Sequence, residues 1–291
     1  MMLSEVKITK QNSMIIRAAT INDWDKLLQF FKKNYRESHP LHNKEFWEWQ
    51  YGDEKFGRSF ICLDDTNRIV AHVGASFENN LAWLMNLYVD KDYEGKRIPA
   101  KLYDLARQYY PLVTTAANKA ALDMYQSMRW IRYHNLIRYV KINPLIAEIN
   151  IENVCKKISV EVDDYIQKDI HYFKQPSIKG LLFADGSRAV SQEDTGGLRV
   201  LDIVSIRELE QNAWQLGYLW IDYTTSWNDT KTRRLEKNGW VPDYQSVVPW
   251  RLNPIEENYF CDVSFLSEQP IDKELIVKRS HSDHGRVGSL K

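Results

Sequence analysis

The sequence predicts an α/β fold of two similar domains, each a mixed, mostly antiparallel, twisted sheet flanked by helices. The first observation is the order of the hydrophobic patterns. Antiparallel strands are followed by strand, helix, strand, helix and strand, up to residue 142. The second observation is that this order recurs in the remainder of the chain. The third is a short set of identical residues that recurs in the two halves at a constant offset.

In the first half, the spacing of apolar residues separates helices from strands. Trp24, Leu27, Leu28 and Phe31 recur at the interval of one helical face. The expected elements are a strand at 14–19, a helix from Trp24, a helix at 43–51, strands at 58–63, 68–77 and 81–89, a helix after Arg97, a strand at 112–116, a helix from Asn118 to Met128 and a strand at 130–142.

The second half begins after a break at Asn143-Pro144 and repeats this order. Asp185-Gly186 is a strong signal for a hairpin turn between two strands. The expected strands are 158–162, 178–184, 188–191, 198–205, 218–224 and 244–251, and the expected helices are 163–173, 206–215 and 228–237.

One segment shows the internal repeat directly. Thr114, Thr115, Asn118 and Trp130 match Thr224, Thr225, Asn228 and Trp240, and every offset is 110 (228 − 118 = 110). Both copies fall on a strand, an Asn-capped helix and a second strand. We therefore expect two domains of one fold, at 1–143 and 144–277, followed by a polar tail at 278–291. Coincidence is the alternative explanation.

Composition excludes several classes of protein. The chain has 291 residues, 44% of them hydrophobic, with 39 basic and 39 acidic side chains. This balance does not indicate binding to nucleic acid or to an acidic membrane surface. No apolar run approaches the roughly 20 residues that span a bilayer, and the first residues lack a signal peptide pattern. We expect a cytoplasmic protein.

Cysteine and histidine usage does not predict a metal site. Cys62, Cys155 and Cys261 are odd in number and share no short spacing, which favours a reducing compartment. His281 and His284 are three residues apart, but they lie in the polar tail. We expect that tail to be a flexible, solvated end.

The turn after Val89 has the pattern of an anion-binding site. A strand leads through Asp90–Arg97 into a helix, whose first backbone N–H groups are unpaired and carry partial positive charge. Gly95 permits close approach of the backbone, and Lys96 and Arg97 add positive charge. Pro99 is tolerated in the first helical turn, where its missing N–H is not required for the helix.

From this point the chain resembles the GNAT (Gcn5-related N-acyltransferase) superfamily, over about residues 14–142. That family has an acyl-CoA loop of pattern Arg/Gln-x-x-Gly-x-Gly/Ala, which corresponds here to Glu94–Pro99. The loop departs from the pattern, because its first position is Glu and two positions that are usually small are Arg97 and Pro99. The family pattern Asn-x-x-Ala-x-x-x-Tyr matches Asn118, Ala121 and Tyr125, and Arg129-Trp130 replaces the usual Gly-Phe.

The resemblance implies acyl-CoA as co-substrate, no metal, and a set of cofactor-binding residues. These are Leu87, Tyr88, Val89, Glu94, Gly95, Lys96, Arg97, Ile98, Pro99, Ala100, Asn118 and Tyr125.

The resemblance also implies roles in acyl transfer to an amine. The family tyrosine at the position of Tyr125 protonates the departing thiolate. The alternative is a purely structural role for Tyr125, in apolar contact with Leu122 and Met128. A base must keep the attacking amine neutral, and the strand at 81–89 contains no carboxylate. Glu78, His72 and Asp90 are the nearest candidates, with a purely structural role for His72 as the alternative.

The second half lacks the acyl-CoA loop and the tyrosine of the family pattern. After Ile203-Val204-Ser205 the chain enters a helix without a glycine or an inserted loop, and Leu235 stands at the position of Tyr125 (235 − 125 = 110). We therefore predict one active site, in the first domain.

The acceptor is predicted by a second resemblance. The aromatic segment Phe46–Tyr51 and the tandem arrangement are similar to sugar N-acyltransferases of polysaccharide biosynthesis, which act on nucleotide-linked amino deoxysugars. The implied acceptor is a dTDP-3-amino-3,6-dideoxyhexose, bound by aromatic residues at Trp47, Trp49, Tyr223 and Trp227. The alternatives are another small amine, a peptide amine, or a non-catalytic domain pair that binds acyl-CoA. The acyl chain, the stereochemistry of the sugar and the oligomeric state are not predicted.

Overall fold

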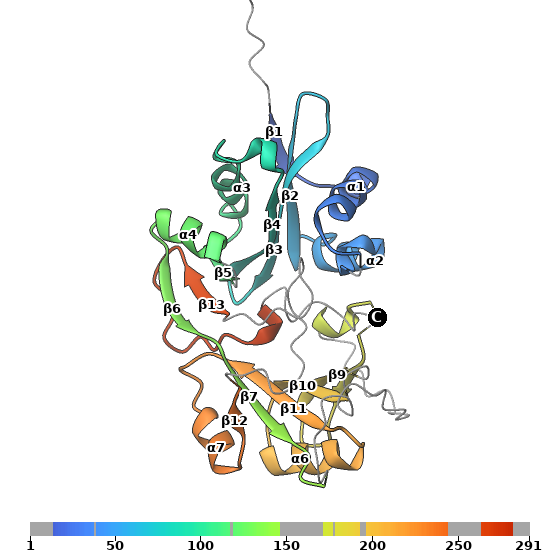
Figure 1. Cartoon of the computed structure of the whole chain (residues 1–291), viewed down its shortest axis with the longest axis vertical. Helices are drawn as coiled ribbons and strands as arrows, with labels where there is room; N and C mark the ends of the chain where they lie inside the picture. The colour runs from blue at the N-terminus through green and yellow to red at the C-terminus, as the bar shows by residue number, and fades with distance from the viewer. Residues whose placement is uncertain are drawn as a thin grey trace, which may run out of the picture.

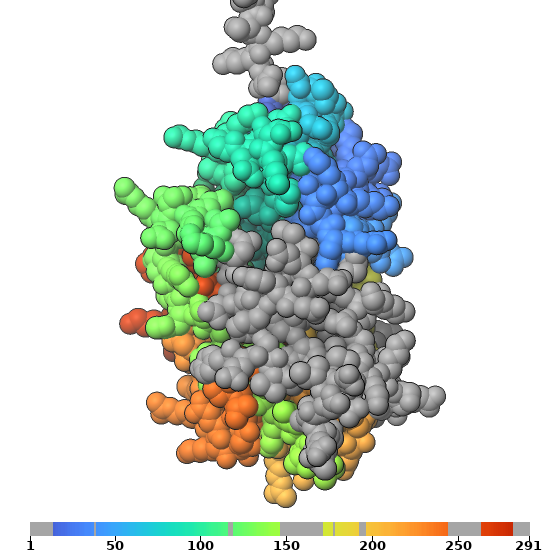
Figure 2. Space-filling view, in the orientation of Figure 1, coloured from blue at the N-terminus to red at the C-terminus, as the bar shows by residue number. Residues whose placement is uncertain are grey.

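Two sheets form the frame of the molecule, one toward each end of its long axis (Figure 1). The computed structural model describes residues 14–37, 39–116, 119–145, 171–176, 178–192, 196–243 and 263–281. In the space-filling view the blue and green residues of the first sheet and its helices gather at one end, and the orange residues of the second lie at the other (Figure 2). The predicted fold class, two mixed and mostly antiparallel sheets flanked by helices, is confirmed.

The first sheet has seven strands and is covered on both faces. Its order is β1 (Ile15–Ala18), β2 (Gly57–Leu63), β3 (Ile69–Glu78), β4 (Leu81–Val89), β5 (Leu112–Ala116), β13 (Ser264–Ser267) and β6 (Ile131–Asn135). Helices α1 (Trp24–Asn34) and α2 (Lys44–Tyr51) bury Phe31 and Trp47 against one face. Helices α3 (Ile98–Ala106) and α4 (Lys119–Ser127) bury Leu102 and Tyr125 against the other.

The second sheet has six strands. Its order is β12 (Val241–Pro242), β7 (Ile137–Ile142), β11 (Trp220–Thr225), β10 (Gly197–Asp202), β9 (Arg188–Gln192) and β8 (Gly180–Leu182). Helices α6 (Ile206–Gln215) and α7 (Thr232–Lys237) pack Leu209 and Leu235 onto one face. The opposite face carries a buried ion pair, in which Arg138 Nε lies 2.7 Å from Asp222 Oδ2.

Each sheet contains a strand from the other half of the chain. β13 lies between β5 and β6, and β7 lies between β11 and β12, so the exchange is reciprocal. The crossover is short, because only Leu136 separates β6 from β7, and its N–H donates to the Val263 carbonyl at 2.8 Å. A single cut at 143/144 therefore does not separate the two sheets, which corrects the domain boundary drawn from the sequence.

The same crossover corrects the strand expected at 130–142. That segment is two strands in two sheets, because the chain passes from one sheet to the other at Leu136 without a turn signal in the sequence. The helix expected from Asn228 begins only at Thr232. The cause is Asp229, whose carboxylate accepts hydrogen bonds from the Tyr223 and Thr225 hydroxyls and from the Lys231 N–H, which holds this stretch in a turn.

The start of the predicted tail is packed rather than solvated. Lys278 forms a β-bridge with Thr225, and the His281 ring stacks on Trp83 with centroids 4.4 Å apart. His281 is only 4% exposed. His284, the strands expected at 158–162 and 244–251, and most of the helix expected at 163–173 lie outside the described residues; positions 171–174 form a 3-10 turn.

The repeat at an offset of 110 is visible in the backbone. The Trp130 N–H donates to the Tyr125 carbonyl at 3.1 Å, and the Trp240 N–H donates to the Leu235 carbonyl at the same distance. The residues before the two tryptophans, Arg129 and Gly239, both have positive φ, of 61° and 79°. Two copies of one motif, strand, helix and left-handed turn, therefore explain the matched residues.

The exchanged strand β13 is expected to be essential for the stability of the first domain. Phe265 is fully buried against Trp83 and Tyr133, so Phe265→Ala should lower the free energy of unfolding by about 3–5 kcal/mol. Ile131→Ala, on the exposed side of neighbouring β6, serves as the control and should cost less than about 1 kcal/mol. Denaturant unfolding measures both, and equal small effects would contradict the exchange.

Candidate active site

The site is built on a fork between two parallel strands. β4 and β5 are paired only from Ala82 opposite Leu112 to Leu84 opposite Thr114. The Thr114 hydroxyl then donates to the Leu84 carbonyl at 3.0 Å, which closes the paired section. Beyond it, residues Met85 to Val89 of β4 have no partner in β5, so the two strands diverge.

A bulge at Asn86 opens the fork. Met85 pairs with Gly74 and Tyr88 pairs with His72, so two residues of β4 stand opposite one residue of β3. Asn86 has a φ of 53°, in the left-handed region. The bulge turns β4 away from β5 at the end of their pairing.

Four side chains hold the bulge. The Asn86 carbonyl accepts from the Tyr35 hydroxyl at 2.9 Å and from His72 Nδ1 at 3.0 Å, and the Asn86 amide donates to the Tyr51 hydroxyl at 3.1 Å. Gly74 makes room for Tyr51, because a Cβ built there would lie 2.0 Å from the tyrosine oxygen. Sequence reasoning missed this group, although a glycine inside a strand is a signal for a bulge or a close approach.

The bulge directs backbone donors into the fork. The Asp90 N–H donates to the Val70 carbonyl on β3, and N–H groups alternate along a strand, so the Tyr88 N–H faces β3 and the Val89 N–H faces the fork. The Asn86 carbonyl points to Tyr35 and His72, so the trans peptide turns the Leu87 N–H away from them. Of the three strand residues predicted to bind the cofactor, Leu87 and Val89 therefore direct their N–H groups toward the fork.

The loop after β4 has the backbone geometry expected of an anion-binding cradle at the start of α3. Gly95 and Arg97 have φ of 74° and 56°, and alternating left-handed residues turn successive N–H groups toward one point. The first N–H groups of α3, at Ile98 and Ala100, have no helical partner, and Pro99 contributes none. Arg97 thus adopts the conformation for which the family pattern uses a small residue.

Side chains fix this loop to the domain. Lys33 Nζ lies 2.7 Å from Asp90 Oδ2, which ties the end of β4 to α1. The Tyr93 hydroxyl donates to Asp64 Oδ2 at 3.0 Å, and Lys96 Nζ lies 4.2 Å from the centre of the Tyr93 ring. Asp90, a candidate base, is buried and held in this anchoring contact.

Tyr125 lies behind the fork, between α3 and α4. Its hydroxyl is 2.9 Å from the Tyr103 hydroxyl, the two rings are nearly parallel, and both are buried. Burial and the neighbouring Tyr125 raise the pKa of Tyr103 well above its ordinary value. Tyr103 is a second residue that sequence reasoning missed. Asn118 lies outside the described residues.

The two other predicted catalytic residues are far from solvent or far from the fork. His72 has no exposed surface, and burial lowers its pKa to about 4. Its Nδ1 donates to the Asn86 carbonyl, so Nε2 accepts from the Ser59 hydroxyl at 2.8 Å in the neutral ring. Glu78 lies before Leu81, about 20 Å of extended strand from Leu87.

Three of the four aromatic residues predicted to bind substrate are structural. Trp47 is 2% exposed in the core under α2, Trp49 donates to the His171 carbonyl at 2.8 Å, and Tyr223 is fully buried with its hydroxyl on Asp229. These side chains have no open face for a ligand, which corrects the prediction. Their spacing reflects core packing of large rings.

Trp227 does border a cavity. The cavity has a volume of about 620 Å³ and is lined by Tyr133, Trp227, Asn228 and Lys273, among others. The Trp227 ring stacks on Tyr133 with centroids 5.4 Å apart and planes 12° apart. Strand register places this end of β6 level with the end of β5, one strand away across β13, because Asn135 and Ala116 both stand opposite Ser264.

The second copy has no fork. Arg199 stands opposite Asp222 as Ala82 stands opposite Leu112 (222 − 112 = 110), so Asp202 occupies the position of Met85. β10 ends there, and α6 begins four residues later. The chain therefore turns into the helix where β4 forms its bulge.

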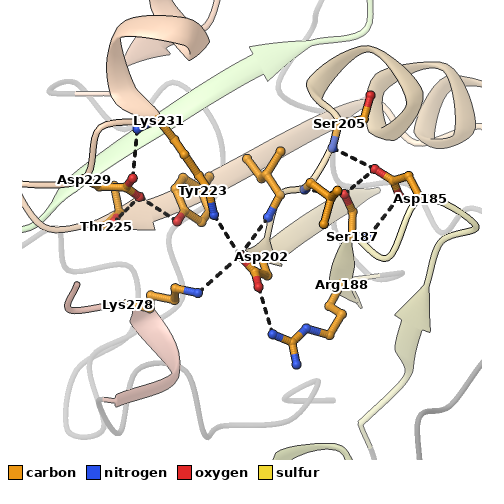
Figure 3. A network of polar contacts seen from close by, with 12 residues as sticks. Asp185, Ser187, Arg188, Asp202, Ser205, Tyr223, Thr225, Asp229, Lys231 and Lys278 are labelled. Carbon is orange, nitrogen blue, oxygen red and sulfur yellow. Dashed lines mark hydrogen bonds and ion pairs between the residues drawn. The ribbon is translucent and has the colours of Figure 1, made fainter. Parts of the chain in front are cut away.

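In the second copy, the donors that would hold an anion are occupied from within. The N–H groups of Ile203, Val204 and Ser205 donate to Asp202, Ser187 and Asp185, at 2.9–3.1 Å (Figure 3). The Ser205 hydroxyl caps α6 by accepting from the Glu208 N–H. Internal oxygens thus take the places that phosphate oxygens would need.

Within the described parts of the chain, no three His, Cys, Asp or Glu side chains are close enough to hold a metal ion. None of the helices in those parts is sufficiently long and apolar to cross a bilayer.

Comparison with known proteins agrees with the fork and cradle. Residues 24–129 match the family model described as "Acetyltransferase (GNAT) family". A crystal structure of a candidate acetyltransferase from Pyrococcus horikoshii is similar over 89% of this chain and 90% of its own, with a TM-score of 0.51 and 16% identity. That likeness supports the fold.

Two further solved structures are more distant. A GNAT-family acetyltransferase from Staphylococcus aureus Mu50 covers 42% of this chain and 87% of its own, with 20% identity and a TM-score of 0.36. A tandem GNAT protein from the clavulanic acid biosynthesis pathway covers 89% of this chain and all of its own, with 10% identity and a TM-score of 0.47. Comparison with curated protein sequences gave no match.

The match to the acetyltransferase family model lies on the first domain and covers about a third of the chain. The fork and the helix-start loop both lie within the matched residues.

We expect one molecule of CoA to bind per chain, because only the first copy has a fork with open donors. Isothermal titration calorimetry with CoA measures the stoichiometry. Gly95→Pro should reduce the affinity at least tenfold, because proline cannot adopt the positive φ and lacks the N–H. Asp185→Ala in the second copy is the control and should leave the affinity unchanged. A stoichiometry of two would contradict the assignment.

Buried His72 makes stability depend on pH. Its pKa is about 4 in the folded chain and about 6.5 in the unfolded chain, so the unfolded chain binds more protons between these values. The contribution of His72 to the free energy of unfolding should be at its maximum above about pH 6.5. It should fall by ~3 kcal/mol as the pH approaches 4. Urea unfolding of the protein and of His72→Gln measures this; identical pH dependence would show that His72 does not contribute.

Proposed function

We propose that this protein transfers the acyl group of acyl-CoA to the amino group of a nucleotide-linked amino deoxysugar, of the dTDP-3-amino-3,6-dideoxyhexose type. In this proposal the cradle at Gly95–Ala100 holds the pyrophosphate of CoA. The pantetheine arm lies along the open edge of β4. The N–H groups of Leu87 and Val89 are the donors for the arm and for the thioester carbonyl.

The proposed chemistry is direct attack of the amine on the thioester. The nitrogen forms a bond to the acyl carbon, and a backbone N–H of the fork stabilises the oxyanion. The C–S bond then breaks, and the thiolate leaves with a proton from Tyr125. With Tyr103 donating to Tyr125, the Tyr125 O–H is directed to the sulfur and the phenolate that forms keeps a donor.

The proton of the amine goes to water in this scheme. His72 is fully buried and already donates to the Asn86 carbonyl, so its role is to hold the bulge. Glu78 stands at the far end of β4. The fork itself presents no carboxylate among the described residues of β4, which leaves a water chain as the acceptor of the proton.

The cavity at Trp227 carries the proposal for the acceptor. Tyr133, Trp227 and Tyr88 all pack at the margin of the core under α1 and α2, on the face opposite α3. Because α3 holds the phosphates of the donor, an acceptor must approach from this other face. The Trp227 ring can stack on a nucleotide base, and Arg132 and Lys273 supply charge for its diphosphate.

A panel of amines tests the acceptor. Thiol release from acetyl-CoA should be fastest with dTDP-3-amino-3,6-dideoxyhexoses, compared with simple amines and with peptides. Trp227→Ala should raise the acceptor KM about tenfold or more by removing a stacking contact of about 1–3 kcal/mol, without changing the KM of acetyl-CoA. Trp227→Phe keeps the ring as a control. Equal rates with simple amines would overturn the sugar assignment, and CoA binding without thiol release would indicate a sensor.

The proposed acid is tested separately. Tyr125→Phe should lower kcat by about 10²-fold and leave the Kd of CoA nearly unchanged, since it removes only a proton donor. Tyr103→Phe is the matched control, because it removes the supporting hydroxyl from the same pair and should lower kcat less. An unchanged kcat in Tyr125→Phe would remove this residue from the mechanism.

A further inference from the structure

A short turn of the chain, residues 271–275, contributes one wall of the cavity at Trp227. At the start of this turn, the Ile271 N–H donates to the Tyr133 hydroxyl at 3.2 Å. Within it, the side chain and the carbonyl of Asp272 accept from the backbone N–H groups two and three residues later, at 2.9 and 3.2 Å. The turn is therefore a fixed part of the wall.

The end of the turn is held by one side-chain amide. Asn228 Nδ2 donates to the Lys273 carbonyl at 2.8 Å and to the Leu275 carbonyl at 2.9 Å. Asn228 Oδ1 accepts from the Ser226 hydroxyl at 2.6 Å, and the Ser226 oxygen accepts from the Val277 N–H at 3.0 Å. The amide of Asn228 therefore uses both of its hydrogens on the turn.

The asparagine that holds the turn belongs to the internal repeat. Asn228 stands at the position of Asn118 (228 − 118 = 110), which the family pattern assigns to the acyl-CoA site. The second copy has no fork, and the N–H groups before α6 donate to oxygens of the chain itself. Its asparagine likewise binds the chain, and it does so at the border of the acceptor cavity. The repeated residue therefore has a separate task in the second copy.

The wall of this cavity carries more positive than negative charge. Its described lining residues include two permanent cations, Arg132 and Lys273, and one carboxylate, Asp272. Arg132 Nη2 donates to the Ser264 hydroxyl at 3.0 Å, whereas Lys273 is exposed and forms no ion pair with any described residue. The Lys273 ammonium therefore keeps its hydrogen-bond donors for an anionic ligand.

We propose, on the basis of the acceptor proposed above, that Asn228 is a positioning residue of the acceptor site and acts through Lys273. By holding the turn at its end, Asn228 places the Lys273 ammonium where it meets the diphosphate of a nucleotide whose base stacks on Trp227. A lysine on a turn that is not held must be ordered when the ligand binds, which costs binding free energy. Loss of Asn228 therefore removes most of what Lys273 contributes.

Calorimetric titration of the full chain with dTDP tests this role, with CoA at saturation so that the ligand does not enter the pyrophosphate cradle. Asn228→Ala and Lys273→Gln should each weaken the binding of dTDP about tenfold, because each weakens a charged hydrogen bond to the diphosphate. The double variant should bind dTDP no more weakly than Lys273→Gln alone, because Asn228 acts through Lys273. Thymidine, which lacks the phosphates, should bind equally to all of these chains.

Asn238→Ala is the matched control, because Asn238 Nδ2 donates to the Arg234 carbonyl of α7 rather than to the turn. It should change the affinity for dTDP by less than about twofold. An unchanged affinity in Asn228→Ala, additive losses in the double variant, or an equal loss of affinity for thymidine would each overturn the role of Asn228 and leave the proposed acceptor in place. If the unsubstituted chain binds no dTDP, the proposed acceptor and the role of Asn228 both fail.

Discussion

The kink at Asn86 is the constraint on which the site depends. A left-handed residue inside a strand is unfavourable, and it persists here because Tyr35, His72 and Tyr51 bind both its carbonyl and its side chain. Tyr35 directly follows α1, His72 lies on β3 and Tyr51 ends α2, so packing of α1 and α2 on the sheet holds this one peptide in place. The open donors of β4 follow from that peptide, because without the bulge β4 would continue beside β5.

The second copy shows what the same architecture becomes without the kink. Its strand order, its parallel pair and its left-handed turn before the tryptophan are retained. The part of the strand that would correspond to Met85–Val89 of β4 is missing. The backbone N–H groups just before α6 donate to Asp185, Ser187 and Asp202 instead. Side-chain oxygens keep these buried N–H groups hydrogen-bonded, so the second copy needs no ligand to satisfy them. The contrast identifies the strand extension, rather than the fold, as the functional part of a copy.

Local signals in the sequence predicted the local structure well. The bounds of β4, β5 and α6 agree with prediction, because strand alternation, turn residues and helical spacing are all encoded within each segment. Sequence reasoning failed where distant segments decide. β6 and β7 were expected as one strand, since the pattern does not show that Leu136 passes between sheets, and β13 was not predicted. Trp47 and Tyr223 were expected to bind substrate but lie in the core. Large aromatic residues are common both in cores and in binding sites, so their presence in the sequence does not separate the two.

The reciprocal exchange of β7 and β13 has a consequence for synthesis of the chain. The first sheet contains Ser264–Ser267, so a ribosome must translate the chain as far as residue 267, beyond the last strand of the second sheet, before the first sheet is complete. Until then β5 presents one edge with no neighbour and β6 has no place beside it. During translation the first half of the chain therefore exposes an unpaired strand edge. A chaperone can bind this edge, or a wrong strand can pair with it.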